Sequence, residues 1–250
     1  MRLVIRVAAM AAGLIFCVPL HYLWKAFGAR SIWPQVYLSF VGRCAGLRVH
    51  VDGQPLTDRV LFVANHVSWL DILALGGATR AIFVSRDDVA NWPLVGWIAS
   101  LNDTLYVARQ ARREVHGQAD QLRQALGKGR AVALFPEGTT AQMMMPFRPS
   151  LFASLFPPLP GVAVQPVVID YGPDADEIAW TGDEPAGANA SRILSRKGTI
   201  DVALRFLAPI DPGGVGDRKQ LAAQAQAEVA QALAAEAASD GAADPLYGRR

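Results

Sequence analysis

Short apolar runs alternate with longer amphipathic stretches through the middle of the chain. The runs at 60–63 and 131–135 are apolar throughout and end at polar residues, as buried strands do, and residues 114–126 have the spacing of an amphipathic helix. Strands that alternate with helices predict an α/β fold, here a mixed, largely parallel sheet flanked by helices. The full pattern predicts strands at 47–51, 60–63, 81–84, 104–108, 131–135, 162–169 and 199–207, and helices at 87–100, 114–126, 150–156 and 217–238.

The same pattern divides the chain into three segments. Residues 1–44 form an apolar helical segment that we expect to be associated with a membrane, and residues 45–215 form the α/β domain. Residues 216–250 form an Ala-rich helix and a tail that we expect to be loose beyond Ser239. A turn signal at 52–53 predicts that the first two strands pair as a β-hairpin.

The N-terminal segment contains an uninterrupted apolar run at 7–20, whereas a spanning helix needs roughly 20 apolar residues. Three interpretations therefore stay open. The run is a short or tilted spanning helix with Tyr22 and Trp24 at the interface, or it lies in one leaflet, or it is a cleaved signal peptide. A second apolar stretch at 31–43, with Pro34 in its first turn, favours a membrane-seated hairpin of two helices.

Charge is distributed unevenly along the chain. Residues 1–51 contain six basic and no acidic residues, so the remainder, with 18 basic and 22 acidic residues, has a net charge of −4. Basic residues beside the most apolar stretch suit anionic lipid and not nucleic acid, which requires a basic folded domain. The two cysteines, Cys17 and Cys44, have no metal-binding or disulfide motif spacing, so we expect free thiols and no bound metal.

His66 and Asp71 follow the predicted strand at 60–63. A histidine at a strand end can remove a proton from a hydroxyl group, and a carboxylate can orient its ring and stabilise the imidazolium. The same residues also fit a purely structural capping box, in which Ser68 caps a helix and Asp71 is its third residue. A helix start that is capped in this way would also be a rigid place to hold an orienting carboxylate.

Polar residues also follow two other strands. Glu137, Gly138, Thr139 and Thr140 succeed the strand at 131–135, where a glycine and hydroxyl groups can hold an anionic or hydroxyl-rich group, or can simply form a turn. Arg109 follows the strand at 104–108 and is either an anion clamp or a solvated arginine.

Two of these segments together resemble the glycerolipid acyltransferases, the family that includes bacterial 1-acylglycerol-3-phosphate acyltransferase. They are Asn-His-Val-Ser-Trp-Leu-Asp at 65–71 and Phe-Pro-Glu-Gly-Thr at 135–139, and the resemblance extends over roughly residues 45–210. Pro93, Gly96, Arg109 and the segment 164–167 match further parts of the family pattern.

The resemblance implies a reaction and a set of roles. His66 would deprotonate the free hydroxyl of a lysolipid and Asp71 would orient His66, so that the alkoxide attacks the thioester of acyl-CoA or acyl-carrier protein. Glu137, Gly138 and Thr139 would position the acceptor, and Arg109 would hold its phosphate. The family uses no metal or prosthetic group. We expect a membrane-bound transferase of lipid metabolism at the cytoplasmic (inner) membrane, with the catalytic domain facing the cytoplasm.

The expected acceptor is 1-acylglycerol-3-phosphate, which would give phosphatidic acid. One departure from the pattern leaves an alternative open, because Thr140 stands where phosphate-accepting members commonly have an arginine. Relatives with threonine there include enzymes that acylate lyso-ornithine lipid, and Arg109 or Arg148 can compensate for the missing guanidinium. From another class, a non-catalytic lipid-binding membrane protein also fits the sequence.

Overall fold

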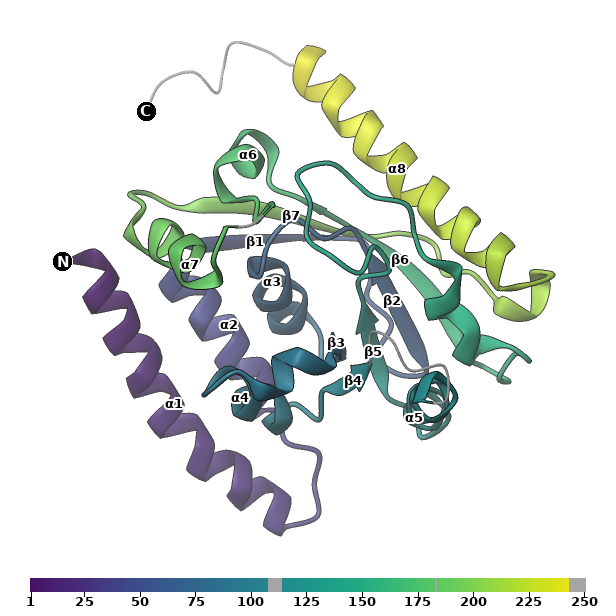
Figure 1. Ribbon diagram of the computed structural model, residues 1–250, viewed down its shortest axis with the longest axis horizontal. Helices are drawn as coiled ribbons and strands as arrows, with labels where there is room; N and C mark the ends of the chain where they lie inside the picture. The colour runs from purple at the N-terminus through teal and green to yellow at the C-terminus, as the bar shows by residue number, and fades with distance from the viewer. Residues whose placement is uncertain (108–113, 183, 243–250) are drawn as a thin grey trace.

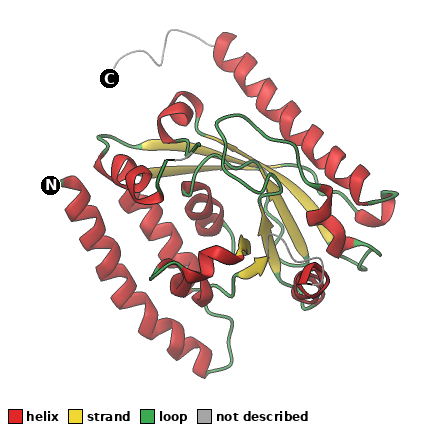
Figure 2. Ribbon diagram, viewed as in Figure 1, coloured by secondary structure: helices red, strands yellow, loops and turns green. Residues whose placement is uncertain are grey.

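The computed structural model describes residues 1–107, 114–182 and 184–242, and its centre is one seven-stranded sheet (Figures 1 and 2). The strand order is β1-β7-β6-β2-β5-β3-β4, and every pairing is parallel except that of β6 with β7. The predicted mixed, largely parallel sheet is therefore confirmed. The strands are β1 (Leu47–Asp52), β2 (Val60–Ala64), β3 (Ile82–Arg86), β4 (Leu105–Val107), β5 (Ala131–Leu134), β6 (Ala163–Asp170) and β7 (Ile200–Phe206).

The predicted hairpin between the first two strands is wrong. β1 pairs in parallel with β7 at one edge of the sheet, and β6 and β7 both lie between β1 and β2. Burial explains the arrangement, because all five residues of β2 are buried whereas β1 exposes every residue after Leu47. A strand that is apolar throughout gains most in the centre of a parallel sheet, so β2 pairs with β5 and β6 and not with its neighbour in sequence.

Helices cover both faces of the sheet and make two separate cores (Figure 1). Val60, Phe62 and Ala64 of β2 point to the first face, where they join a core with α2, α3 and α7. Leu61 and Val63, one residue out of phase, point to the second face and pack with α5 and α8. The helices are α2 (Trp33–Ala45), α3 (Leu70–Ala78), α5 (Glu114–Gly127), α7 (Ala186–Ser195) and α8 (Arg218–Ala242).

The first helix, α1 (Arg2–Ala26), lies along α2 at the outside of the first face (Figure 1). Its 25 residues make it the one helix of the described chain that is long and apolar enough to cross a membrane. Gly13 contacts the ring of Phe40, and the Tyr37 hydroxyl donates a hydrogen bond to the Met10 carbonyl, which ties α1 to α2. The two predicted N-terminal helices are present, and large apolar side chains of α1 stay exposed: Val4, Ile5, Val7, Ile15, Phe16 and Leu23.

Several predicted helices differ in detail. The helix predicted at 87–100 is broken by Pro93 into a 3₁₀ turn (Asp87–Asn91) and α4 (Val95–Leu101), because proline lacks the N–H that a helix interior requires. The predicted helix at 150–156 is a 3₁₀ segment (Pro149–Leu155). The last helix continues to Ala242, past the point at which we expected a loose tail, and residues 243–250 lie outside the described chain. The sequence pattern missed α6 (Ala175–Ile178) and α7.

The contact between α2 and α3 generates a prediction about stability. A Cβ atom added at Gly77 of α3 would lie 2.9 Å from the Cα of Ser39 in α2, so Gly77→Ala must push the two helices apart. We expect the free energy of unfolding to fall by about 1–3 kcal/mol, measured by denaturant unfolding in detergent. Gly187→Ala is the matched control, since Gly187 is also helical but has no atom within 4 Å of its added Cβ. It should be neutral or stabilising, and equal effects of the two variants would contradict the packing.

Candidate active site

Three neighbouring strands bring the polar segments together at one edge of the sheet. β2 lies between β5 and β6 and is parallel to both, so the carboxyl ends of all three strands meet at the same edge. The residues that follow them are His66 after β2, Glu137 after β5 and Tyr171 after β6. The structure therefore joins the first two predicted segments, which are more than sixty residues apart in the chain.

His66 and Asp71 form a hydrogen-bonded pair. The Nδ1 atom of His66 lies 2.8 Å from Oδ2 of Asp71. Asp71 is fully buried in the first turn of α3, whereas 15% of the His66 side chain is exposed. Because a carboxylate accepts the proton on Nδ1, the neutral ring has its lone pair on Nε2, which has no partner among the described residues. This is the arrangement of a histidine base and its orienting carboxylate.

The Asp71 carboxylate is held by four donors in total. Oδ2 also accepts the backbone N–H groups of Val67 at 2.7 Å and Ser68 at 2.9 Å, and Oδ1 accepts the hydroxyl of Tyr171 at 2.6 Å. The bond to the Ser68 N–H is one half of the expected capping box, and the other half is a long bond in which the Leu70 N–H donates to the Ser68 hydroxyl oxygen at 3.5 Å. Asp71 thus both starts α3 and orients His66, so the structural and the catalytic interpretation are compatible.

Tyr171 is a contributor that the sequence did not suggest. It comes from the end of β6, a hundred residues from Asp71, and is 2% exposed. Burial, together with the neighbouring negative charge of Asp71, raises the pKa of the Tyr171 hydroxyl well above its usual value, so it acts as a hydrogen-bond donor. Its position just after a predicted strand was the available signal, but a lone tyrosine there is more often a core residue.

The plane of the His66 ring is fixed by an aromatic contact. The ring stacks on Phe135 with a centroid distance of 3.9 Å and an angle of 10° between the planes. Phe135 is buried and stacks in turn on Phe83 of β3, so the imidazole rests on the core of the first face. Nδ1 is then fixed by Asp71 and the ring face by Phe135, which leaves little freedom to turn Nε2.

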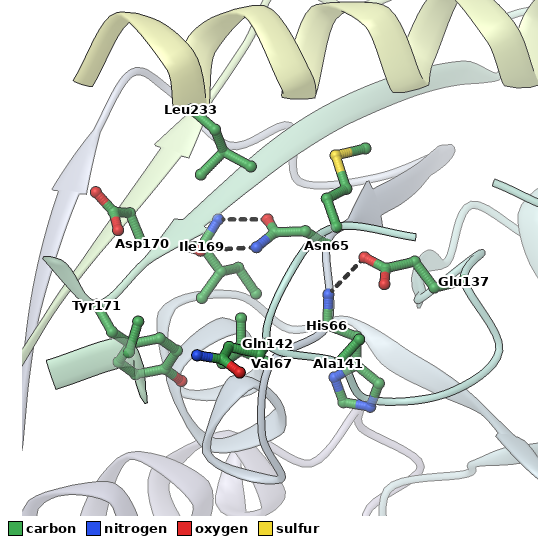
Figure 3. A pocket seen from close by; sticks show the side chains of 12 residues that line it. Asn65, His66, Val67, Glu137, Ala141, Gln142, Ile169, Asp170, Tyr171 and Leu233 are labelled. Atoms are coloured by element: carbon green, nitrogen blue, oxygen red, sulfur yellow. Dashed lines mark hydrogen bonds between the residues drawn. The ribbon is translucent and has the colours of Figure 1, made fainter. Parts of the chain in front are cut away.

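The backbone on each side of His66 is also anchored. The Asn65 side chain donates to the carbonyl of Ile169 at 2.8 Å and accepts from the N–H of the same residue at 2.9 Å, as a further residue of the sheet would do (Figure 3). The His66 carbonyl accepts from the N–H of Ala141 at 2.9 Å. The loop after β2 is therefore fastened to the ends of both neighbouring strands.

The Glu137 carboxyl group connects the loop after β2 with the loop after β5. Its oxygens accept the backbone N–H groups of His66 and Met145, each at 3.0 Å, and the residue is 2% exposed (Figure 3). Burial raises the Glu137 pKa to about 7, although the two N–H groups oppose the shift. The expectation that Glu137 contacts the acceptor stays a prediction, since both oxygens already bind backbone.

The following loop presents Gly138, Thr139 and Thr140. Gly138 has a φ of +74°, which favours glycine, and its N–H donates to the carbonyl of Phe135. The Thr139 side chain is exposed at the rim. Arg109, the predicted anion clamp, lies outside the described residues.

A small pocket of about 100 Å³ adjoins this loop (Figure 3). Asp170, Leu233 of α8 and Glu137 contribute to its lining. His66, Val67 and Tyr171 line it as well, so the pocket lies at the carboxyl ends of β2, β5 and β6 beside the histidine. In the part of the chain that the structure describes, no group of three or more His, Cys, Asp or Glu side chains could hold a metal ion.

Comparisons with known proteins identify the family of this chain. The Acyltransferase family model matches residues 47–170, a range that includes β1 to β6 and the segments containing His66, Asp71 and Glu137. The chain is 34% identical to lyso-ornithine lipid O-acyltransferase of Rhodobacter capsulatus, over 91% of this chain and 88% of that protein. It is 28% identical to 1-acyl-sn-glycerol-3-phosphate acyltransferase of Neisseria gonorrhoeae, over 72% of this chain and 73% of the relative.

A solved structure shares the fold. The crystal structure of the 1-acyl-sn-glycerophosphate acyltransferase PlsC from Thermotoga maritima superposes with a TM-score of 0.63 at 20% identity, covering 95% of this chain and 98% of the other. The sequence resemblance, the family model and the histidine-aspartate pair point the same way: the chain belongs to the acyltransferase family.

Proposed function

We propose that the protein is a membrane-bound O-acyltransferase that moves a fatty acyl group from a thioester donor to the hydroxyl of a lysolipid. The observation that carries the proposal is the pair of His66 and Asp71, 2.8 Å apart, at the rim of the sheet, where no described residue bonds to Nε2 of His66. Catalysis by a base needs an accessible nitrogen on a fixed ring, and the bond to Asp71 and the stacking on Phe135 fix the ring of His66.

The proposed chemistry needs no covalent intermediate on the enzyme. Nε2 of His66 takes the proton of the acceptor hydroxyl while the oxygen attacks the thioester carbonyl, and the imidazolium is stabilised by Asp71. The new C–O ester bond forms as the C–S bond breaks, and the departing thiolate takes the proton from His66. The donor we propose is acyl-CoA or acyl-carrier protein, and the reaction requires no cofactor.

The N-terminal helices support a membrane location. Within the described chain nothing buries the exposed apolar side chains of α1, and insertion into lipid would remove them from water. Because α1 and α2 cover the first face, on which the His66 ring lies, seating them in the membrane brings the base to the lipid phase (Figure 1). We propose the inner membrane, with the catalytic domain in the cytoplasm where both donors occur.

Two acceptors have support, and lyso-ornithine lipid has more of it. The 34% identical relative carries that activity in its name, and Thr140 lacks the guanidinium that would complement a phosphate. The sequence expectation, 1-acylglycerol-3-phosphate, is the second candidate because the 28% identical relative is named for it. Arg109 as the residue that holds a phosphate remains part of this second candidate only.

Substitution of the base should abolish turnover without unfolding the protein. We expect His66→Ala to lower acyl transfer on the order of 10²–10⁴-fold, with thermal unfolding close to that of the wild type. His50→Ala is a matched control, since His50 of β1 also lies 3.0 Å from an aspartate, Asp201 of β7, but both of these side chains are exposed to solvent. Its transfer rate should be unchanged, and undiminished transfer by His66→Ala would rule out the mechanism.

An acceptor panel decides between the candidates. Thiol release from acyl-CoA and from acyl-carrier protein is measured with purified protein and either lyso-ornithine lipid or lysophosphatidate. We expect faster release with lyso-ornithine lipid. The reverse order would establish the second candidate. Tight binding of lysolipid without thiol release from either donor would make the protein a non-catalytic lipid-binding protein.

The raised pKa of Glu137 gives the stability of the site a dependence on pH. The Glu137 carboxyl group has a pKa near 4.5 in the unfolded chain and near 7 in the folded protein. The stability that Glu137 contributes by keeping its proton in the folded protein is therefore complete below pH 4.5 and is lost as pH rises through about 7. Relative to Glu137→Gln, the wild type should lose on the order of 1 kcal/mol of unfolding free energy per pH unit within this window. Denaturant unfolding of both proteins measures the difference, and a difference that is constant from pH 4.5 to 7 would contradict the shift.

A further inference from the structure

Arg148 lies against the glycine of the loop that follows β5. A Cβ atom added at Gly138 would be 3.0 Å from both Cζ and Nη1 of the Arg148 guanidinium, so the missing side chain is what allows this approach. The backbone N–H of Arg148 donates to the Pro136 carbonyl at 2.9 Å, which fixes the residue beside the loop. The contact joins two residues that are ten positions apart, across the loop that contains Thr139 and Thr140.

The Arg148 guanidinium is a cation that no described residue neutralises. Arg148 is exposed, and no carboxylate or carbonyl among the described residues accepts a hydrogen bond from its side chain. It is the only basic residue between 136 and 148 in the sequence. By contrast, Arg130 and Arg205, two half-buried arginines of the domain, are paired with aspartates.

The loop beside it offers further donors. The backbone N–H groups of Thr139 and Thr140 have no acceptor among the described residues, whereas those of Gly138 and Ala141 on either side are bonded to Phe135 and His66. Unpaired N–H groups in a turn next to a guanidinium are the donors that an anion binds. Ala141 is bonded to the carbonyl of His66, so this group of donors is connected directly to the residue that carries the base.

We propose that Arg148, with the loop at 139–140, binds the anionic group of the acceptor headgroup. This inference rests on the proposed function and assigns the headgroup contact to a residue of this chain. A guanidinium binds a carboxylate or a phosphate through two parallel hydrogen bonds, so the site fits the carboxylate of an ornithine headgroup and, by the same chemistry, a lysolipid phosphate. In either acceptor only a few bonds separate the anion from the hydroxyl that His66 must reach.

Equilibrium binding without any acyl donor tests the assignment separately from catalysis. Lyso-ornithine lipid and its carboxyl methyl ester are titrated into wild-type protein and into Arg148→Ala in detergent micelles. The wild type should bind the free acid roughly 10- to 100-fold more tightly than the ester, the range for loss of a charged hydrogen-bonded contact. Arg148→Ala should bind the acid as weakly as the ester, and Arg148→Lys should recover part of the difference.

Kinetics then identify the molecule whose anion is bound. With acyl-CoA as donor, Arg148→Ala should raise the KM for the acceptor by a similar factor while kcat and the KM for acyl-CoA stay unchanged. A raised KM for acyl-CoA with an unchanged acceptor KM would place a donor phosphate on Arg148 and overturn the proposal. Arg80→Ala is the control, because Arg80 is exposed and precedes β3 at the opposite edge of the sheet.

Failure of this inference differs from failure of the proposed function. If the wild type binds the acid and the ester equally, the assignment of Arg148 is wrong even when transfer to lyso-ornithine lipid occurs. If the wild type prefers the acid through Arg148 but releases no thiol, the headgroup site stands and the acyltransferase reaction fails.

Discussion

The buried carboxylate of Asp71 is the constraint on which the rest of the site depends. An ionised carboxylate that is fully buried is costly unless donors surround it, and here one histidine, two backbone N–H groups and one tyrosine do so. To place each donor next to this carboxylate, the chain must adopt a particular local structure. The loop at 66–68 must turn back over the start of α3, and β6 must end beside β2 so that Tyr171 can reach Oδ1.

Because side chains alternate between the two faces of the sheet, different residues support the His66 ring and fix the backbone of the loops. Phe135 points to the first face and supports the His66 ring, next to the helices that we propose to lie in the membrane. Asn65 and Glu137 instead bind the backbone of the same loops. Because successive side chains along a strand point to opposite faces, one short segment can both support the ring and bind the backbone. His66 is therefore held through its backbone on one side and through the packing of its ring on the other.

Much of the site could be predicted from local sequence. His66, Asp71 and the loop at 137–140 were found because apolar runs ended in polar residues, and parallel strands bring such ends to one edge. Tyr171 and Phe135 could not be assigned, because their roles arise from strand order, and sequence does not say that β6 and β5 flank β2. The failed hairpin between β1 and β2 has the same origin, since a turn signal is local whereas central burial of β2 is a property of the whole sheet.

The central claim is that His66 and Asp71 act as one unit, and a double-mutant cycle tests it most directly. Transfer rates are measured for His66→Ala, Asp71→Asn and the double variant, with thermal unfolding as the check on folding. If Asp71 acts only through the ring of His66, the double variant should be no slower than His66→Ala alone. Losses that multiply, so that the double variant is slower by the product of the two single effects, would contradict the account.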